Sequence, residues 1–111
     1  MAEIQFARGV KEETIPDVRI TRSRSGNQSV ATFYFESPKA FSSESAEDIT
    51  GMYLIDEEGE IVTKDVKGVF VQGQAKKIQA IYIMNSTEEW ERFLRFMNRY
   101  AEENGLDLSR S

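Results

Sequence analysis

A single amphipathic helix at the C-terminal end of an otherwise strand-forming chain is the feature that most constrains the fold. Ser86-Thr87-Glu88-Glu89 matches a capping box, in which the first and last residues satisfy backbone amides at the start of a helix. Asn104-Gly105 is a typical stop signal, because glycine readily adopts the left-handed conformation that ends a helix. The sequence therefore predicts one long helix over roughly residues 87–104.

Apolar residues recur at helical spacing between these two signals, and the stripe consists of Trp90, Phe93, Leu94, Met97, Tyr100 and Ala101. Ion pairs spaced i,i+4, from Glu88 to Arg92 and from Glu91 to Arg95, contribute only about 0.2–0.5 kcal/mol each. Packing of the aromatic stripe is therefore expected to dominate the stability of this helix. Phe96 lies off the centre of the stripe, and we expect it to extend an apolar surface beyond the core.

Alternation of apolar and polar residues predicts strands over most of residues 3–84. Ile4 and Phe6 mark a short first strand, and residues 17–35 are predicted to form a β-hairpin that turns at Ser25-Gly26-Asn27. Pro38 and the acidic residues 42–48 predict a loop or a single helical turn.

Three further strands are predicted after this loop, over residues 49–56, 60–71 and 76–84. The middle one reads as a long or broken strand in which Gly68 marks a bulge. Together with the helix, the pattern predicts one α+β domain spanning residues 1–111. Its architecture is expected to be an antiparallel β-meander of about five to six strands packed with the long C-terminal amphipathic helix.

Composition excludes several classes of chemistry. The chain of 111 residues has no cysteine and no histidine, so it lacks disulfides, thiolate nucleophiles, the commonest metal ligand and the commonest general base. Its net charge of -5 argues against general binding to nucleic acid, which depends on clustered Lys and Arg. The sequence also has no apolar run of 18 residues, and Met1-Ala2-Glu3-Ile4-Gln5 lacks the charged-then-apolar order typical of a signal peptide. We therefore expect no cofactor, no resident metal and no change of compartment after synthesis.

The acidic residues Asp56-Glu57-Glu58-Gly59-Glu60 are a candidate Ca²⁺ site, and Asp56 and Glu58 are a candidate pair of catalytic carboxylates. The spacing lacks the alternating acids and the distal Glu of an EF-hand loop. Acid and base roles would require two carboxylates whose surroundings separate their pKa values. We expect instead a solvated, exposed hairpin turn.

An arginine-rich segment between Arg19 and Arg24 is the candidate binding site. Arg19, Arg22 and Arg24 are interleaved with Thr21 and Ser23, and no acidic residue occurs from position 18 to position 35. Guanidinium groups bind carboxylates and phosphates bidentately, so an acidic partner or anionic lipid headgroups would fit. The alternative is a solvated hairpin whose arginines serve solubility and protect a sheet edge. Composition alone leaves both readings open.

Four long segments, taken in order, resemble the photosystem II assembly-factor family called Psb-twenty-eight. They are PDVRITRSRSG at residues 16–26, ATFYF at 31–35, ITGMYLIDEEGEIVTKDVKG at 49–68 and EEWERFLRFMNRYAEENGL at 88–106. The resemblance is weakest at residues 37–47 and 71–79, which include the predicted loop and the turn at Gln72-Gly73-Gln74.

This resemblance implies a binding role without catalysis. Members of the family associate transiently with photosystem II intermediates on the cytosolic (or stromal) face of the thylakoid, as peripheral and partly soluble proteins. The implied partners are the chlorophyll-binding inner antenna protein and the loops of the reaction-centre subunits near the quinone acceptor side. The implied task is assembly or repair.

A strand edge of the predicted sheet suits such a role, because a partner's loop can add to it by main-chain hydrogen bonding. One alternative function is a small RNA-binding module, in which the Arg19–Arg24 hairpin contacts phosphates and Phe33 or Tyr34 stacks on bases. A second is a carboxylate-based hydrolase, which no residue spacing supports.

Overall fold

The computed structural model describes residues 2–23, 28–36 and 49–106, and these residues form eight strands and one helix. The α+β architecture expected from the sequence is confirmed, with more strands than the five to six predicted. The bounds of the strands and the helix are β1 Glu3–Ala7, β2 Val10–Lys11, β3 Asp17–Arg22, β4 Ser29–Glu36, β5 Met52–Asp56, β6 Gly59–Thr63, β7 Val66–Val71, β8 Gln74–Met84 and α1 Thr87–Asn104. The predicted loop at residues 37–48 and the turn at residues 25–27 lie outside the described residues.

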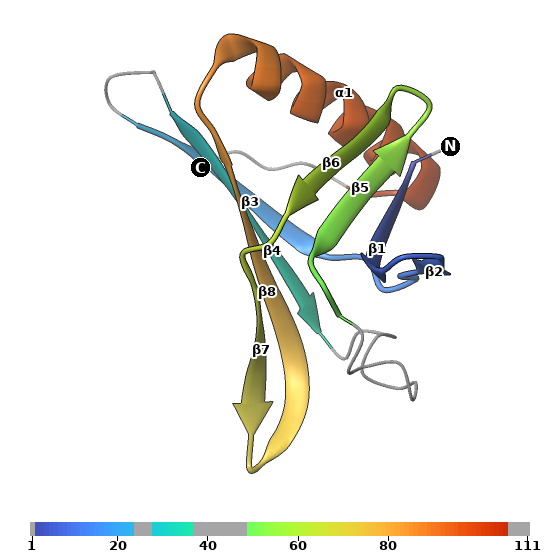
Figure 1. The fold of residues 1–111 in the computed structure, drawn as a ribbon, viewed down its shortest axis with the longest axis vertical. Coiled ribbons are helices and arrows are strands. Elements are labelled where there is room, and N and C mark those ends of the chain that lie inside the picture. The colour runs from blue at the N-terminus through green and yellow to red at the C-terminus, as the bar shows by residue number, and fades with distance from the viewer. Residues whose placement is uncertain (1, 24–27, 37–48, 107–111) are drawn as a thin grey trace.

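The strands form two antiparallel sheets of four strands each instead of one continuous meander (Figure 1). The first has the order β2-β1-β5-β6 and the second the order β3-β4-β8-β7. The strand predicted over residues 60–71 is broken, and its two halves, β6 and β7, belong to different sheets. The irregularity predicted at Gly68 lies between Val69 and Phe70, where the register of β7 against β8 shifts.

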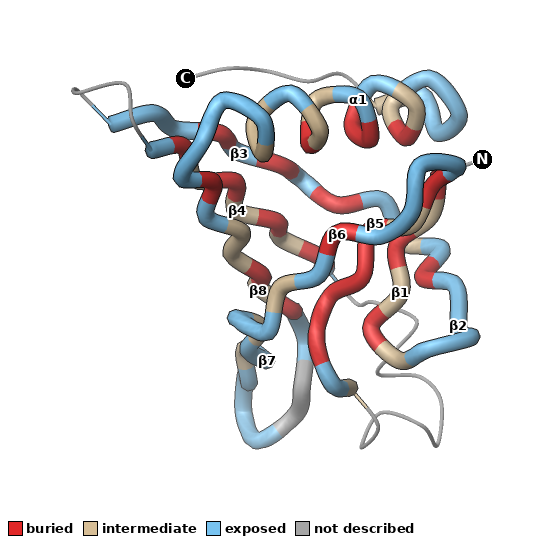
Figure 2. The backbone as a smooth tube through the Cα atoms, turned by 45° about the horizontal axis from the view of Figure 1, so that its top comes forward, coloured by how far each residue is buried: buried red, intermediate tan, exposed pale blue. Residues whose placement is uncertain are grey.

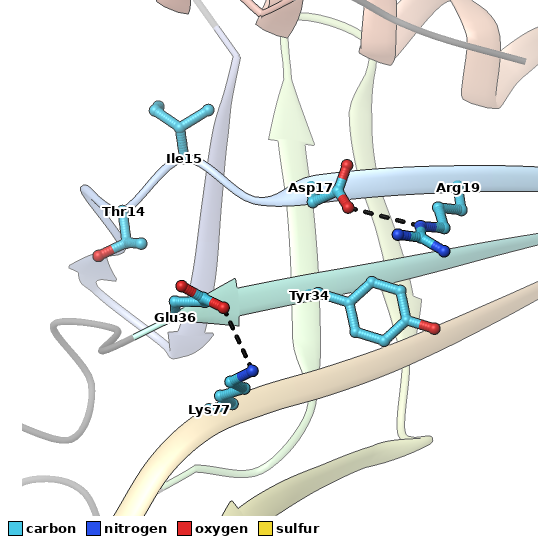
Figure 3. Close-up of a pocket in the computed structure, with 7 residues that line it drawn as sticks. All are labelled: Thr14, Ile15, Asp17, Arg19, Tyr34, Glu36 and Lys77. Carbon is cyan, nitrogen blue, oxygen red and sulfur yellow. Dashed lines mark ion pairs between the residues drawn. The ribbon is translucent and has the colours of Figure 1, made fainter.

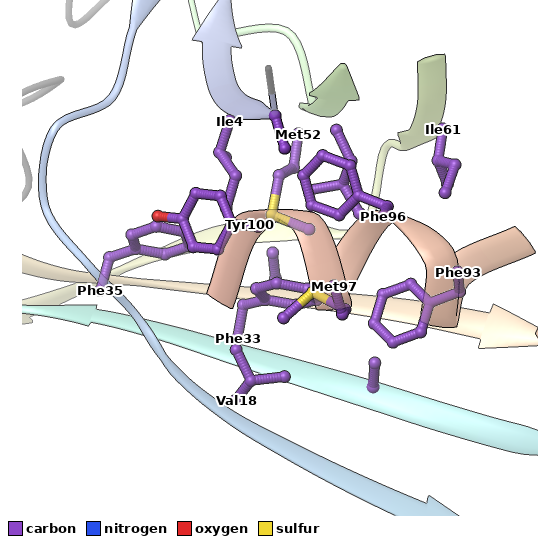
Figure 4. Packing of buried hydrophobic residues seen from close by; sticks show 14 of the residues in the cluster. Ile4, Val18, Phe33, Phe35, Met52, Ile61, Phe93, Phe96, Met97 and Tyr100 are labelled. Carbon is purple, nitrogen blue, oxygen red and sulfur yellow. The ribbon is translucent and has the colours of Figure 1, made fainter. Parts of the chain in front are cut away.

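The core fills the space between the two sheets and α1 (Figures 2 and 4). Alternation along β4 directs Phe33 and Phe35 inward, where both are fully buried. The neighbouring β3 contributes Val18 and Ile20 to the same face. Phe35 meets Phe6 of the first sheet edge-on, with ring centroids 4.8 Å apart. The two sheets are thus joined through shared aromatic packing.

The helix buries a wider arc than the predicted stripe, and the prediction for Phe96 is wrong. Phe96 is completely buried together with Phe93, Met97 and Tyr100, whereas Trp90 is only partly buried. The physical reason is that α1 contacts β5 of the first sheet and β8 of the second, so two sides of the helix are covered instead of one. Figure 4 shows Phe93, Phe96 and Tyr100 within the core.

Both predicted ends of the helix are confirmed. The Ser86 hydroxyl accepts a hydrogen bond from the backbone N–H of Glu89 at 3.1 Å, and the Glu89 carboxylate accepts one from the backbone N–H of Asn85 at 3.1 Å. At the other end, Gly105 has a φ of 67° and donates its backbone N–H to the carbonyl of Ala101. These local contacts fix where α1 starts and stops against the sheets.

Candidate functional site

One face of the β3-β4-β8-β7 sheet packs on the core, and the opposite face is open. Cross-strand pairing aligns Arg19 with Thr32 and Thr32 with Ile81, and all three are exposed or half-buried. Tyr34 lies on the same side, next to Gln79 of β8. We call this surface the open face and define it by the outward side chains of β3, β4 and β8, which are Asp17, Arg19, Thr21, Val30, Thr32, Tyr34, Glu36, Lys77, Gln79, Ile81 and Ile83.

A hollow of about 550 Å³ opens at one end of this face (Figure 3). Charged side chains of both signs line it, together with Thr14, Ile15 and Tyr34. Arg19 lies 3.5 Å from the carboxylate of Asp17 and holds its guanidinium 5.7 Å from the centre of the Tyr34 ring. Lys77 pairs with Glu36 at 3.2 Å. The hollow therefore offers mixed charge around an aromatic ring, which suits a polar peptide better than a uniformly charged ligand.

Among the described strands, β3 and β7 are the edges of this sheet. An edge strand carries backbone N–H and C=O groups on one side that no neighbouring strand satisfies. β3 is also the strand that carries Arg19 and Thr21, so one edge combines backbone hydrogen-bonding groups with charged side chains. Such an edge can accept an added strand from a partner.

The structure separates the predicted site residues. Arg19 and Thr21 belong to the open face. Arg22 lies on the opposite side of β3, the side that faces the core, and its guanidinium is 5.1 Å from the ring centre of Trp90 on α1. Ser23 is exposed, and its backbone N–H donates to the carbonyl of Gln28 at 2.8 Å. Arg24 lies outside the described residues. Alternation along β3 thus puts Arg19 and Arg22 on opposite sides of the sheet.

One of the two residues proposed as a base-stacking platform is misplaced for that role. Phe33 is fully buried, with its ring 6.1 Å from that of Phe93. Tyr34 is half-buried on the open face, beneath Arg19. The aromatic surface expected of an RNA-binding hairpin is therefore reduced to a single ring.

The acidic turn between β5 and β6 is exposed at residues 57–60, as expected from the sequence, but Asp56 is buried. The Asp56 side chain is completely buried, and it accepts hydrogen bonds from Arg92 at 2.6 Å and from Arg99 at 2.8 Å. Glu58 accepts from Arg95 at 2.9 Å and from Arg99 at 2.6 Å. The i,i+4 spacing predicted that Arg92 and Arg95 pair with acidic residues of the helix itself. Instead, they bind the acidic turn and hold α1 against the first sheet.

The arginines also fix the charge of this turn. Burial opposes ionisation of Asp56, but hydrogen bonds from Arg92 and Arg99 outweigh it and lower its pKa to about 2. Hydrogen bonds from Arg95 and Arg99 lower the pKa of Glu58 to about 2 as well. Both carboxylates are therefore ionised at neutral pH, so neither can act as a general acid. Across the described part of the chain, no cluster of three or more acidic residues has the arrangement of a metal site.

Stability is expected to fall on acidification from about pH 5 towards pH 2. The folded-state pKa values of Asp56 and Glu58, about 2, lie below the ordinary values of 3.8 and 4.5. In this window the unfolded chain binds more protons, so the stabilisation is complete above the ordinary values and is lost as pH approaches 2. Urea unfolding at pH 6 and pH 3 measures the effect, and Asp56→Asn should show a smaller difference between the two. Equal differences for the variant and the parent chain would contradict this assignment.

The hollow contains residues that were not selected from the sequence, namely Thr14, Ile15, Asp17, Glu36 and Lys77. Alternation alone predicts that Glu36 and Tyr34 share a side of β4. What it cannot predict is the pairing of Glu36 with Lys77, because that depends on the register of β4 against β8, far apart in the sequence.

In the described ranges, no helix has the length and apolar character needed to cross a membrane.

The fold and its surface define a small α+β protein with an open sheet face and free strand edges among its described residues. A family model described as Psb28 protein matches residues 4–108. The chain is 60% identical over 111 residues to the Photosystem II reaction center Psb28 protein of Crocosphaera subtropica, covering 100% of both chains. The chain belongs to the Psb28 family, which is the family that its sequence segments resemble.

Other relatives carry the same name. The Photosystem II reaction center Psb28 protein of Rippkaea orientalis is 62% identical over 111 residues, which cover 100% of this chain and 97% of the relative. That of Synechococcus elongatus is 56% identical over 108 residues, which cover 97% of this chain and 96% of the relative. The similarity therefore includes the strands, the helix and the acidic turn, not a single motif.

Proposed function

We propose that this chain is a non-catalytic factor that binds immature photosystem II during assembly or repair. Binding is transient and takes place on the cytosolic (or stromal) face of the thylakoid, near the inner antenna protein and the quinone acceptor side. The observation that carries the proposal is the near-full-length similarity to proteins named for the photosystem II reaction centre. The site chemistry agrees with it, because Asp56 and Glu58 are both engaged by arginines and remain ionised.

The open face and its β3 edge supply the docking surface in this proposal. A loop of a reaction-centre subunit adds to the free edge of β3 through main-chain hydrogen bonds. Arg19 then leaves its exposed contact with Asp17, which at 3.5 Å and with both side chains more than half exposed contributes little to stability. Its guanidinium is available to a carboxylate of the partner, which gives the added strand its register.

Affinity isolation from photosynthetic membranes tests this proposal with face-specific variants. Arg19→Glu on the open face is expected to reduce recovery of photosystem II at physiological salt by about tenfold or more, because a charge pair becomes a repulsion. Arg22→Glu, on the opposite side of the same strand, should reduce it less. Lys11→Glu, an exposed lysine on β2, is the matched control and should recover photosystem II as the parent chain does.

Two results bear directly on the docking proposal. If the triple variant Arg19→Ala, Arg22→Ala and Arg24→Ala co-purified with the assembly intermediate as well as the parent chain, the arginine contribution would be refuted. If Arg19→Glu, Arg22→Glu and Lys11→Glu each reduced the recovery of photosystem II by the same amount, the preference for the open face would be refuted instead.

A further inference from the structure

The tip of the β7–β8 hairpin exposes apolar side chains that are not part of the hydrophobic core. Phe70 is 66% exposed and Val71 is 48% exposed, the two highest values among the large apolar residues whose side chains the structure describes. Figure 1 shows the hairpin extending along the long axis of the molecule, away from α1. By alternation, Phe70 continues the core-facing side of β7, but it lies beyond the point where the core ends. An exposed phenylalanine of this kind indicates a contact made outside the chain.

The turn makes this tip narrow and well defined. Gln72 and Gly73 form a two-residue connection with positive φ values of 54° and 80°, the backbone of a type I′ turn. This turn matches the twist of the two strands it joins. The register shift beside Phe70 increases that twist further. The tip therefore presents its apolar side chains on a narrow hairpin rather than on a broad flat surface.

The charge of the hairpin is opposite to that of the chain. Residues 64–77 contain four lysines and one aspartate, whereas the whole chain has a net charge of -5. Lys77 forms an ion pair with Glu36. Lys67 and Lys76 are exposed, and none of the ion pairs of the described residues includes either of them. An apolar tip flanked by unpaired lysines is complementary to an anionic lipid surface.

We propose that the hairpin tip, defined as residues 69–73, inserts directly into the headgroup region of an anionic lipid bilayer. Phe70 and Val71 enter the boundary between headgroups and acyl chains, and Lys67 and Lys76 bind the headgroups. Lys67 lies three residues from Phe70 along the strand, about 10 Å at the usual rise, which matches the insertion depth of interfacial elements.

The shape of the molecule supports this orientation. The acidic first turn of α1, with Glu88 and Glu89, lies at the opposite end of the long axis from the tip (Figure 1). An anionic surface therefore attracts the tip and repels the helix end. This contact with lipid does not depend on which protein partner occupies the open face, so it goes beyond the proposed binding to photosystem II.

Co-sedimentation with lipid vesicles tests the proposal on the purified chain. Binding is expected to vesicles that contain phosphatidylglycerol and not to vesicles of phosphatidylcholine alone. Phe70→Ser should weaken partitioning by about tenfold or more, because the apolar contact is lost. Lys67→Gln and Lys76→Gln should each weaken it about fivefold. Val62→Ser, which removes an aliphatic side chain of 37% exposure on β6, away from the tip, is the matched control and should leave binding unchanged.

A second measurement locates the tip in the bilayer. In a Trp90→Phe background, Phe70→Trp places the chain's only tryptophan at the tip. Its fluorescence is expected to be quenched by lipids with brominated acyl chains in phosphatidylglycerol vesicles.

Three results would overturn the proposal: no binding of the parent chain to anionic vesicles, equal binding of Phe70→Ser, or no quenching of the tip tryptophan. If Phe70→Ser binds vesicles normally but loses photosystem II, the tip contacts protein and not lipid. The two proposals fail separately, because Arg19→Glu should retain vesicle binding even where it loses photosystem II.

Discussion

Replacing Asp56 with alanine is expected to lower the free energy of unfolding by about 3 kcal/mol. Its side chain is completely buried, and its removal leaves Arg92 and Arg99 without their buried partner, so that only Glu58, at 3.9 Å and 2.6 Å, still pairs with both. Removing one partner of a buried ion pair costs about 3–5 kcal/mol. The low end applies because 20% of the Arg92 side chain and 31% of the Arg99 side chain remain exposed, so water compensates in part. Urea unfolding at neutral pH measures the difference.

Glu57→Ala is the control for this prediction. Glu57 belongs to the same turn, but its side chain is 63% exposed and its ion pair with Arg99 spans 4.0 Å. Its loss should change the stability by less than about 1 kcal/mol. If the two variants were equally stable, the acidic turn would not hold the helix in the way its geometry indicates.

Replacing Phe93 with alanine is expected to cost about 4 kcal/mol of folding stability. The ring is completely buried between the helix and the second sheet, with its centroid 6.1 Å from Phe33 and 5.7 Å from Tyr82. The loss combines the transfer of a large apolar side chain with the cavity it leaves. For a domain whose total stability is about 5–15 kcal/mol, this is a large fraction. Thermal and urea unfolding measure it.

The control for Phe93→Ala is the same substitution at Phe70. Because 66% of Phe70 is exposed, Phe70→Ala should change stability by no more than about 0.5 kcal/mol. A comparable loss for both variants would mean that the hairpin tip packs within the fold, which would also contradict its proposed contact with lipid.

Local signals in the sequence predicted the local parts of the fold. The capping box at Ser86 and the glycine at position 105 define α1 within one residue, because both act through neighbouring backbone groups. Alternation likewise predicted the hairpin of β3 and β4. The division into two sheets was not predicted, because it depends on where Glu3–Ala7 pairs, and its partner is β5, about fifty residues away.

In the candidate site, too, features that depend on neighbouring residues were predictable from the sequence, and contacts between distant residues were not. Arg19 is exposed because it alternates with the buried Val18 and Ile20, whereas its role in binding stays a prediction. Sequence reasoning grouped Arg22 with Arg19 by proximity in the chain, although two residues an odd number apart on a strand face opposite ways. The role of Arg92, Arg95 and Arg99 was missed, although their spacing of three and four residues places them on one helix face. A partner on another strand has no signature in one sequence.

We propose that this chain binds photosystem II while that complex is immature. Pulse labelling of newly made reaction-centre subunits, followed by affinity isolation of the tagged chain at successive times, tests it most directly. We predict that labelled subunits are recovered with the chain early and leave it as labelled, finished photosystem II accumulates. Recovery of the chain without photosystem II subunits, in cells that are actively assembling the complex, would contradict the claim.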